Sequence, residues 1–343
     1  MSSKDLVLST FRLENRKEVP VTIYGGGAWT IYNSRNTFVS LAEDPHKMAR
    51  VIIDTYRKMG WDMVFVGSGY NNYLAAALGG EIKAREGAVP DLKEPFVNSP
   101  VDLEAIDLEA IEKNPVIQNI WKATRLVAKD IGDEVVVTAT AWGPFTFAAQ
   151  LRGVENLMRD VYKRPELAKS VIELSRKAVT LFYTPIVEDE TIEVVALAEP
   201  TASGDLISKR HFESFVLPPL QRFSSDMKDM DVYTFLHICG NTTDKLDAIA
   251  KSGVGLISID SKVDISEAKK VFSGIMCLGG NINPVAVMKD GSTKDVEKVS
   301  LACLKKAAPG GGFFLMPGCD IPSSVPEGNI RAMIETARKY RVT

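Results

Sequence analysis

The sequence predicts an α/β fold of the (β/α)8 TIM-barrel type, built as a single domain over residues 1–343. Short apolar runs rich in Val, Ile, Phe and Tyr recur along the chain, and amphipathic helical patterns separate them. No long linker or low-complexity tract divides the chain. Nearly all-apolar strands are typical of parallel sheets covered by helices on both faces. About eight such strands alternating with helices indicate a barrel.

Eight runs are expected to form the strands. In chain order they are VTIYG (21–25), DMVFVG (62–67), EVVVTAT (134–140), VVALAE (194–199), VYTFLH (232–237), GLISID (255–260), IMCLGG (275–280) and GFFLMPG (312–318). The residues before the first run form an N-terminal extension. The segment from about 68 to 130 is longer than one helix. We therefore expect an excursion after the second strand, with a hairpin or lid around residues 79–97.

Helix signals fill several of the intervals between these runs. DPHKMARVIIDTYRKMG (44–60) begins with Asp44 as the expected N-cap and Pro45 at the first helical position, and it ends at Gly60. SEAKKVF (266–272) and STKDVEKVSLACLKKAA (292–308) each begin with a serine that is expected to cap the helix. In PEGNIRAMIETARKYR (326–341) the apolar residues recur at helical spacing.

An open, doubly wound sheet is the alternative arrangement of the same elements. That fold usually carries a glycine-rich fingerprint at its first strand–helix turn. GGGAW (25–29) is rich in glycine but lacks the spacing of the fingerprint and the start of a following helix. The barrel is therefore the preferred interpretation.

Composition excludes several classes of function. A formal net charge of −3 gives no reason to expect nucleic acid or an anionic membrane as a partner. No apolar run approaches the roughly 20 residues of a membrane span, and the N-terminal MSSKDLVLSTFRLENRK is a poor signal peptide. We therefore expect a cytoplasmic protein. Four cysteines do not make a disulfide scaffold in a chain of this length, so they are core residues, metal ligands or reactive thiols.

Chemically active residues follow the predicted strands. Glu199, His237 and Asp260 end the fourth, fifth and sixth runs, and Cys239, Asn281 and Cys319 follow the fifth, seventh and eighth. The carboxyl ends of barrel strands, with the loops that follow them, form the active face. These residues are therefore expected at one end of the barrel.

The spacing of His237 and Cys239 has a physical interpretation. Residues i and i+2 of an extended segment point the same way, so an imidazole and a thiolate can meet at one ion. Cys319 could add a second thiolate, and two sulfurs with one nitrogen favour zinc. Three protein ligands leave a fourth position open, which is typical of a catalytic site. Two thiolates cancel the charge of the ion, which favours alkylation of a bound thiol over hydrolysis.

The same residues also have purely structural interpretations. A His-x-Cys pair at a strand end is more often incidental than metal-binding, and the residues alone do not bring Cys319 to it. Cys277 and Cys303 lie in apolar contexts and are expected in the core. An acid such as Glu199 at a strand end can equally cap a helix.

Several longer segments resemble the uroporphyrinogen decarboxylase superfamily, in its zinc-dependent corrinoid methyltransferase branch. The resemblance is strongest over WGPFTFAAQLRGVENLMRDVYKRPELAKSVIE (142–173), EPTASGDLISKRHFESFVLPPLQRF (199–223), HICGNTTDKLDAIAKSGVGLISID (237–260), LGGNINPVAVMKDGSTKDVEKV (278–299) and GGFFLMPGCDIPSSVPEGNIRAMIETARKY (311–340). The metal motif of the branch is a His-x-Cys followed far downstream by a cysteine. The resemblance therefore implies a barrel in which His237, Cys239 and Cys319 bind Zn²⁺.

The implied activity is methyl transfer between a corrinoid protein and a small substrate held on zinc, such as a thiol similar to coenzyme M. The chain shows no obvious cobalamin-binding module, so a partner protein would carry the methylcobamide. The corrinoid is expected over the active face, where the loops around Tyr70 and Trp142 are candidate contacts. Glu199 is a candidate temporary fourth ligand or substrate partner. Asp260 and Asn281 are candidates for orienting a ligand or the substrate.

Three other functions stay open. The enzyme could take the methyl group from a specific donor and pass it to Co(I)-corrinoid, or it could be a metal-free decarboxylase, or a barrel that binds a tetrapyrrole without catalysis. The decarboxylases of the superfamily grip porphyrin carboxylates with an arginine-rich N-terminal motif. The corresponding VPVTIYGGGAWTIYN (19–33) has no arginine. Porphyrin decarboxylation is therefore not expected.

Overall fold

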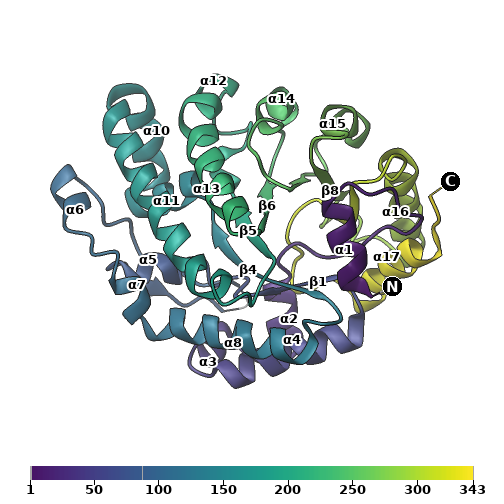
Figure 1. Ribbon diagram of the computed structural model, residues 1–343. Helices are drawn as coiled ribbons and strands as arrows, with labels where there is room; N and C mark the ends of the chain where they lie inside the picture. Colours follow the sequence, from purple (N-terminus) through teal and green to yellow (C-terminus); the bar gives the residue numbers. More distant parts are fainter. Residues whose placement is uncertain (1, 87, 343) are drawn as a thin grey trace.

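The computed structural model describes residues 2–86 and 88–342. Its centre is a curved sheet of seven parallel strands, with helices on the outside (Figure 1). The strands follow one another across the sheet in chain order: β1 (Met63–Val66), β4 (Val136–Trp142), β5 (Val194–Ala198), β6 (Tyr233–Ile238), β7 (Leu256–Ile259), β8 (Cys277–Ile282) and β9 (Phe313–Pro317). This is the strand–helix alternation of a TIM-like fold, and seven of the eight predicted runs form strands.

Helix α4 (Pro45–Met59) precedes the first strand, and the other longer helices lie between the strands or follow the last one. They are α8 (Pro115–Ile131), α9 (Pro144–Arg152), α10 (Val154–Lys163), α11 (Pro165–Val187), α13 (Leu217–Asp229), α15 (Ile265–Phe272), α16 (Thr293–Ala307) and α17 (Glu327–Lys339). Shorter helices are α1 (Ser3–Phe11), α2 (Gly27–Asn33), α3 (Phe38–Ala42), α5 (Tyr73–Ala77), α6 (Pro100–Glu104), α7 (Ala110–Lys113), α12 (Lys209–His211) and α14 (Leu246–Ile249). Single turns of other helix types occupy Pro200–Ala202, Phe212–Val216 and Thr243–Lys245.

The predicted helix caps are confirmed in two cases and wrong in one. Asp44 caps α4, whose C-terminal cap is Gly60, and Ser292 caps α16. Helix α15 is capped by Asp264 instead of Ser266, because the Asp264 side chain accepts the N–H groups of Ser266 and Glu267. A carboxylate two residues upstream thus takes the place that we expected for the serine hydroxyl.

The prediction that residues 21–25 form a strand is wrong. Val21 makes a single parallel bridge with Leu315 of β9, and the Asp62 N–H donates to the Val21 carbonyl. Pro20 has no N–H to extend pairing on one side. On the other, the chain turns away through Gly25 and Gly26, whose φ angles are +70° and +67°. We expected no helix to start after these glycines. This expectation is wrong, because helix α2 begins at Gly27.

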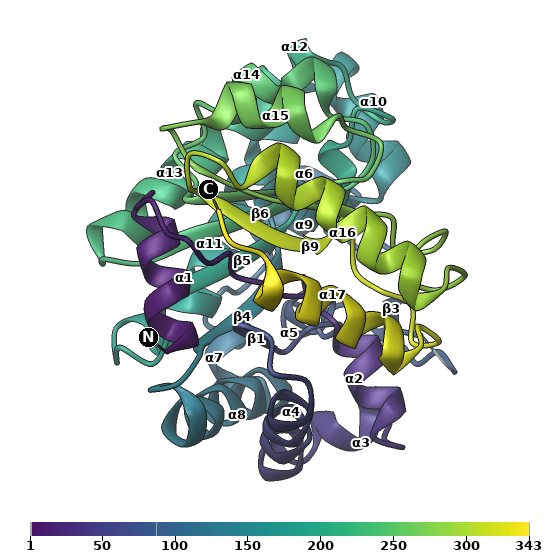
Figure 2. The same cartoon turned by 90° about the vertical axis from the view of Figure 1, so that its right-hand side faces the viewer.

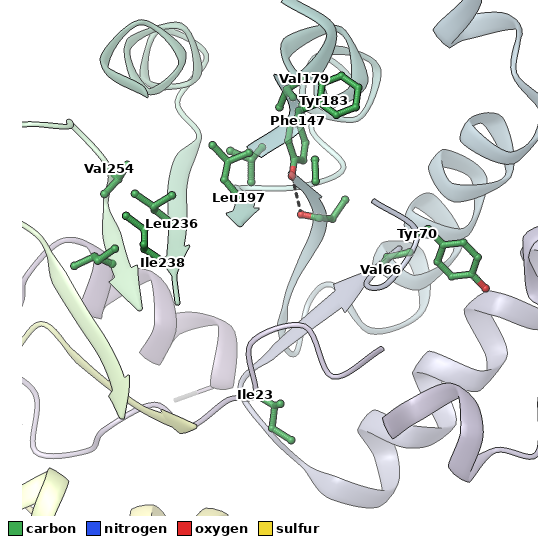
Figure 3. Packing of buried hydrophobic residues seen from close by; sticks show 14 of the residues in the cluster. Ile23, Val66, Tyr70, Phe147, Val179, Tyr183, Leu197, Leu236, Ile238 and Val254 are labelled. Carbon is green, nitrogen blue, oxygen red and sulfur yellow. Dashed lines mark hydrogen bonds between the residues drawn. The ribbon is translucent and has the colours of Figure 1, made fainter. Parts of the chain in front are cut away.

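The apolar residues form two layers, one on each face of the sheet. Side chains that point inward, such as Met63, Phe65 and Phe235, pack inside the curved sheet. Their neighbours in the strands point outward and pack against the helices; Figure 3 shows part of this layer, including Leu197, Leu236 and Tyr183. Both faces are thus buried, which explains why strands such as β5 carry no polar alternation.

The N-terminal extension closes the end of the sheet opposite the strand carboxyl ends. Helix α1 packs beside the beginnings of β1 and β4 (Figure 2). The Lys4 N–H donates to the Glu134 carbonyl just before β4, and the Phe11 ring stacks on Tyr233, the first residue of β6. The opposite end of the sheet is therefore the open end.

The excursion after β1 contains the expected hairpin. Its strands, β2 (Ile82–Lys83) and β3 (Asp91–Leu92), pair antiparallel; within the predicted stretch, Gly87 lies outside the described residues. The N–H groups of Phe96 and Val97 donate to the Leu151 carbonyl and tie the segment to α9. None of the helices in the described part of the chain is both long and apolar enough to cross a bilayer.

A buried ion pair joins α9 and α10 and gives a prediction about stability. Arg152 Nε lies 2.8 Å from Asp160 Oδ2, and the two side chains are 4% and 0% exposed. We expect Asp160→Ala to lower the free energy of unfolding by about 3–5 kcal/mol, because the Arg152 charge would stay buried without a partner. Glu166→Ala is the control, since the surface pair of Glu166 with Lys169 is worth at most about 1 kcal/mol. Urea unfolding measures both, and equal losses would contradict the expectation.

Candidate metal centre

One histidine and two cysteines meet at the open end of the sheet. His237 lies near the end of β6, Cys239 follows that strand, and Cys319 follows β9. His237 Nε2 is 3.0 Å from Cys239 Sγ, which is 3.3 Å from Cys319 Sγ. All three side chains offer a ligand atom, and these atoms lie within 4.8 Å of one another. The structure therefore brings together residues that are 80 positions apart, with neither cysteine in a disulfide.

The His237 ring is held so that Nε2 faces the two sulfurs. Its Nδ1 lies 3.1 Å from Ser258 Oγ, on the neighbouring strand β7, where His237 and Ser258 are register partners. Its face stacks on the Tyr24 ring with centroids 4.7 Å apart. If Nδ1 carries the proton and donates it to Ser258, the Nε2 lone pair is free for a metal. Sequence reasoning missed Ser258, although it is the one polar residue within the strand LISI.

Asp260 and Asn281 support the loop that carries Cys239. Asp260 Oδ2 accepts the Gly240 N–H at 2.9 Å, directly after Cys239. Gly240 has a φ of +77°, and a Cβ there would lie 2.2 Å from Ser203 Oγ, so the tight turn requires glycine. Asn281 Nδ2 donates to the carbonyls of Asp260 and Val263. Both residues thus act on the backbone around the cluster rather than on the cavity.

Cys239 and Cys319 lie within hydrogen-bonding distance of each other, and this contact shifts their pKa values in opposite directions. The hydrogen bond from Cys239 lowers the pKa of Cys319, and His237 acts in the same direction. The same hydrogen bond, with burial, raises the pKa of Cys239. A cation bound by both sulfurs would displace any proton from the two thiols, because metal ligation requires the thiolate.

The ligand cluster forms part of the wall of a cavity of about 220 Å³. The described residues that line it are Tyr24, Gly25, Ser68, Gly69, Asn71, Asn72, Val89, Pro90, Thr140, Trp142, Ala198, Pro200, His237, Cys239, Cys319 and Asp320. Trp142 Nε1 donates to Asn72 Oδ1, and Asn72 Nδ2 donates to the Pro90 carbonyl. These bonds link β4, the loop after β1 and the hairpin into one wall.

Trp142 and Tyr70, the candidate corrinoid contacts, have different surroundings. Trp142 lines the cavity and is half-buried. Tyr70 is 3% exposed, packs edge-on against Phe38 and donates its hydroxyl to the Phe38 carbonyl (its side chain is drawn in Figure 3). Tyr70 therefore has no free surface to offer a docked cofactor. Its neighbours Gly69, Asn71 and Asn72 reach the cavity instead.

The Glu199 side chain binds the start of α9. Its Oε1 accepts the Phe145 N–H at 2.9 Å and its Oε2 accepts the Thr146 N–H at 2.7 Å. Burial raises the pKa of Glu199 to about 7, while the hydrogen bonds to its carboxylate act in the opposite direction. Among the described residues, the structure does not bring Glu199 to the three clustered ligands. Of the two sequence interpretations of this residue, the helix cap matches its contacts.

The cluster fits a zinc ion. Tetrahedral zinc with Zn–S bonds of about 2.3 Å places its two sulfurs about 3.8 Å apart. The 3.3 Å between Cys239 and Cys319 is a few tenths of an ångström shorter, a difference that small side-chain rotations remove. The donor set of two sulfurs and one imidazole nitrogen is a zinc set, and Ser258 supplies the hydrogen bond that a ligating histidine normally makes.

Comparisons with known proteins give a family, related sequences and a shared fold. Residues 2–340 match the family described as Uroporphyrinogen decarboxylase (URO-D). A methylcobamide:CoM methyltransferase MtbA of Methanosarcina mazei is 31% identical over 252 residues, covering 74% of this chain and 72% of that protein. A methylcobamide:CoM methyltransferase MtaA of Methanosarcina barkeri is 30% identical, covering 87% and 85%. A solved methyltransferase from Methanosarcina mazei shares the fold, with a TM-score of 0.87, 24% identity and 99% coverage of each chain.

Proposed function

Because the chain belongs to the uroporphyrinogen decarboxylase (URO-D) family, we propose that it is a zinc-dependent methyltransferase that moves a methyl group between the corrinoid of a partner protein and a small substrate. The observation that carries the proposal is the meeting of His237, Cys239 and Cys319 at the wall of a cavity. Relatives named methylcobamide:CoM methyltransferases support the reaction class.

Each residue of the site has a proposed task. His237, Cys239 and Cys319 hold the zinc ion, which would acidify a bound thiol and leave its sulfur electron-rich. Ser258 fixes the His237 ring, and Asp260 fixes the turn after Cys239. The Asn281 side chain supports Asp260 by donating a hydrogen bond to the Asp260 backbone carbonyl. Glu199 anchors α9, and its role as fourth ligand is not retained.

The cavity suits a small substrate and leaves the corrinoid outside. Its volume of about 220 Å³ is below the range of about 300–1,000 Å³ that is typical of drug-sized ligands. A corrinoid or a porphyrin is far larger, so we propose that the corrinoid protein docks over the mouth of the cavity, near Trp142. No arginine or lysine is among the described residues of the cavity wall, which argues against a substrate with porphyrin carboxylates.

The test is a methyl-transfer assay with zinc-loaded protein and a methylated corrinoid protein. Transfer from methyl-Co(III) to a small thiol, or from a methyl donor to Co(I), would support the proposal and also give the direction. The proposal would be contradicted if the protein bound one zinc ion per chain but transferred no methyl group in either direction with any of the thiols and methyl donors tested. Loss of CO₂ from a carboxylated substrate without metal would favour the decarboxylase instead.

Ser258 gives a prediction about zinc affinity. We expect Ser258→Ala to weaken zinc binding by about 10–100-fold, because the His237 ring loses the partner that sets its tautomer and orientation. Competition with a chromophoric chelator measures the affinity. Ser300→Ala is the matched control, since Ser300 is equally buried on α16 and its hydroxyl has no partner among the described residues. Unchanged zinc affinity in Ser258→Ala would rule out this role for Ser258.

A further inference from the structure

We propose that Asn71 and Thr140 select the small substrate by binding its far end, and that this end carries an oxygen that accepts a hydrogen bond. The inference deepens the proposed function, on which it rests, because it concerns the same cavity. The sulfur or other methyl-bearing atom lies at the zinc ligands. The oxygen, a few bonds away, lies against the amide of Asn71.

The Asn71 amide is held at the inner wall of the cavity with one end free. Side chains alternate along a strand, and Ala139 and Ala141 pack in the outer layer, so Thr140 of β4 points inward. The Thr140 hydroxyl donates to Asn71 Oδ1 at 3.2 Å. Asn71 is partly buried and lines the cavity with Thr140. Because Asn71 Nδ2 has no hydrogen-bond partner among the described residues, it is a free donor for a ligand.

The other amide, indole and hydroxyl groups of the described wall are already bound or buried. Both ends of the Asn72 amide are bound, one by Trp142 Nε1 and the other by a backbone carbonyl. Ser68 Oγ accepts a backbone N–H at 3.1 Å. The Tyr24 hydroxyl has no partner among the described residues, but its oxygen is buried. Asn71 is therefore the side chain of this wall that can best donate to a ligand.

Alanines on β5 leave space between this pair and the zinc ligands. Trp142, Ala198 and His237 are register partners across β4, β5 and β6. Thr140 pairs with Ala196, one inward-facing position deeper. Adjacent strands lie about 4.8 Å apart, so about 10 Å separates β4 from β6. At these two positions β5 presents only methyl groups to the inside of the sheet. A small ligand can therefore extend from His237 past Ala198 to Thr140.

An oxygen at the far end of the substrate completes the hydrogen bonding of this wall. A ligand that fills the cavity separates Asn71 Nδ2 from water, so an apolar end would leave the amide without a partner, at a loss of binding free energy. An oxygen in the same place accepts the hydrogen bond. Val89, Pro90 and Pro200 also line the cavity, and they favour a short carbon chain between the two ends of the ligand.

Matched pairs of thiols test the inference. They are 2-mercaptoethanol with 1-propanethiol, and 3-mercapto-1-propanol with 1-butanethiol, in which a hydroxyl replaces a methyl group at equal length. Calorimetry on the zinc-loaded protein measures the dissociation constants, and the ratio within a pair gives the preference for the hydroxyl. We expect Asn71→Leu, which keeps the size of the side chain without its amide, to reduce this preference by at least about fivefold in one pair or both.

Asn98→Leu is the matched control, because Asn98 is exposed and does not line the cavity. It should leave the preference unchanged in both pairs. Zinc content and circular dichroism verify that each variant is folded and loaded. A folded Asn71→Leu protein with the unchanged preference would overturn the inference and leave the proposed function intact.

Ala198→Leu tests the path between the two ends of the ligand. The larger side chain would occupy the space between Trp142 and His237, so we expect all the thiols to bind at least about tenfold more weakly, with unchanged zinc content. Unchanged thiol affinity in this variant would place the ligand elsewhere and overturn the inference. If none of the thiols bound the unsubstituted protein in a zinc-dependent manner, the proposed transfer to a thiol would be overturned as well.

Discussion

We expect Cys239→Ala to reduce bound zinc from one ion per chain to near zero and to abolish methyl transfer. Two protein ligands would remain, and a two-ligand site does not hold zinc tightly. The fold should survive, because Cys239 lies in a loop, is only partly buried, and its sulfur contacts the two other proposed ligands. Elemental analysis gives the zinc content, and circular dichroism with thermal unfolding reports the fold.

Cys303→Ala is the matched control for this experiment. Cys303 is buried on α16, where its sulfur lies 3.8 Å from Asn281 Oδ1. Its removal should cost on the order of 1 kcal/mol of packing energy and leave the zinc content unchanged. Full zinc occupancy in Cys239→Ala would refute the ligand assignment. Zinc loss in Cys303→Ala would show that metal content follows general stability and not the proposed ligands.

Glu199→Ala is expected to lower the free energy of unfolding by about 2–4 kcal/mol, because two buried donors of α9 lose their acceptor. The Glu199 side chain is completely buried, and both of its oxygens accept N–H groups from the first turn of this helix. A carboxylate there also interacts favourably with the positive end of the helix dipole. Denaturant unfolding measures the loss, and Glu199→Gln, which retains one acceptor, should lose less.

The same variants decide between the two sequence interpretations of Glu199. If Glu199 anchors α9, its substitution lowers stability and does not weaken zinc binding. A folded Glu199→Gln protein should therefore retain its zinc. A fourth ligand would give the opposite pattern, with unchanged unfolding and weakened zinc binding. That second pattern would contradict the position in which the structure holds this carboxylate.

The strands were the most predictable part of the fold. Where both faces of a strand are buried, as in β5, a continuous apolar run indicates the element directly. The run at 21–25 is equally apolar but pairs at Val21 alone. Pro20 and the turn at Gly25 and Gly26 limit its pairing, and such limits outweigh apolar composition.

The site was predictable in its ligands and less so in its supports. His237, Cys239 and Cys319 could be singled out because rare residues follow strands at a spacing that a known family shares. Ser258 could not, because a serine within a strand is common in many contexts. Its importance comes from the register of β6 with β7.

The central claim is that one nitrogen and two sulfurs of this chain hold one zinc ion. X-ray absorption at the zinc K-edge of the loaded protein tests it most directly. We predict two sulfur scatterers at about 2.3 Å and nitrogen or oxygen scatterers at about 2.0–2.1 Å, with a third sulfur when a thiol is added. Zinc surrounded by nitrogen and oxygen alone, or a protein that takes up no zinc, would contradict the account.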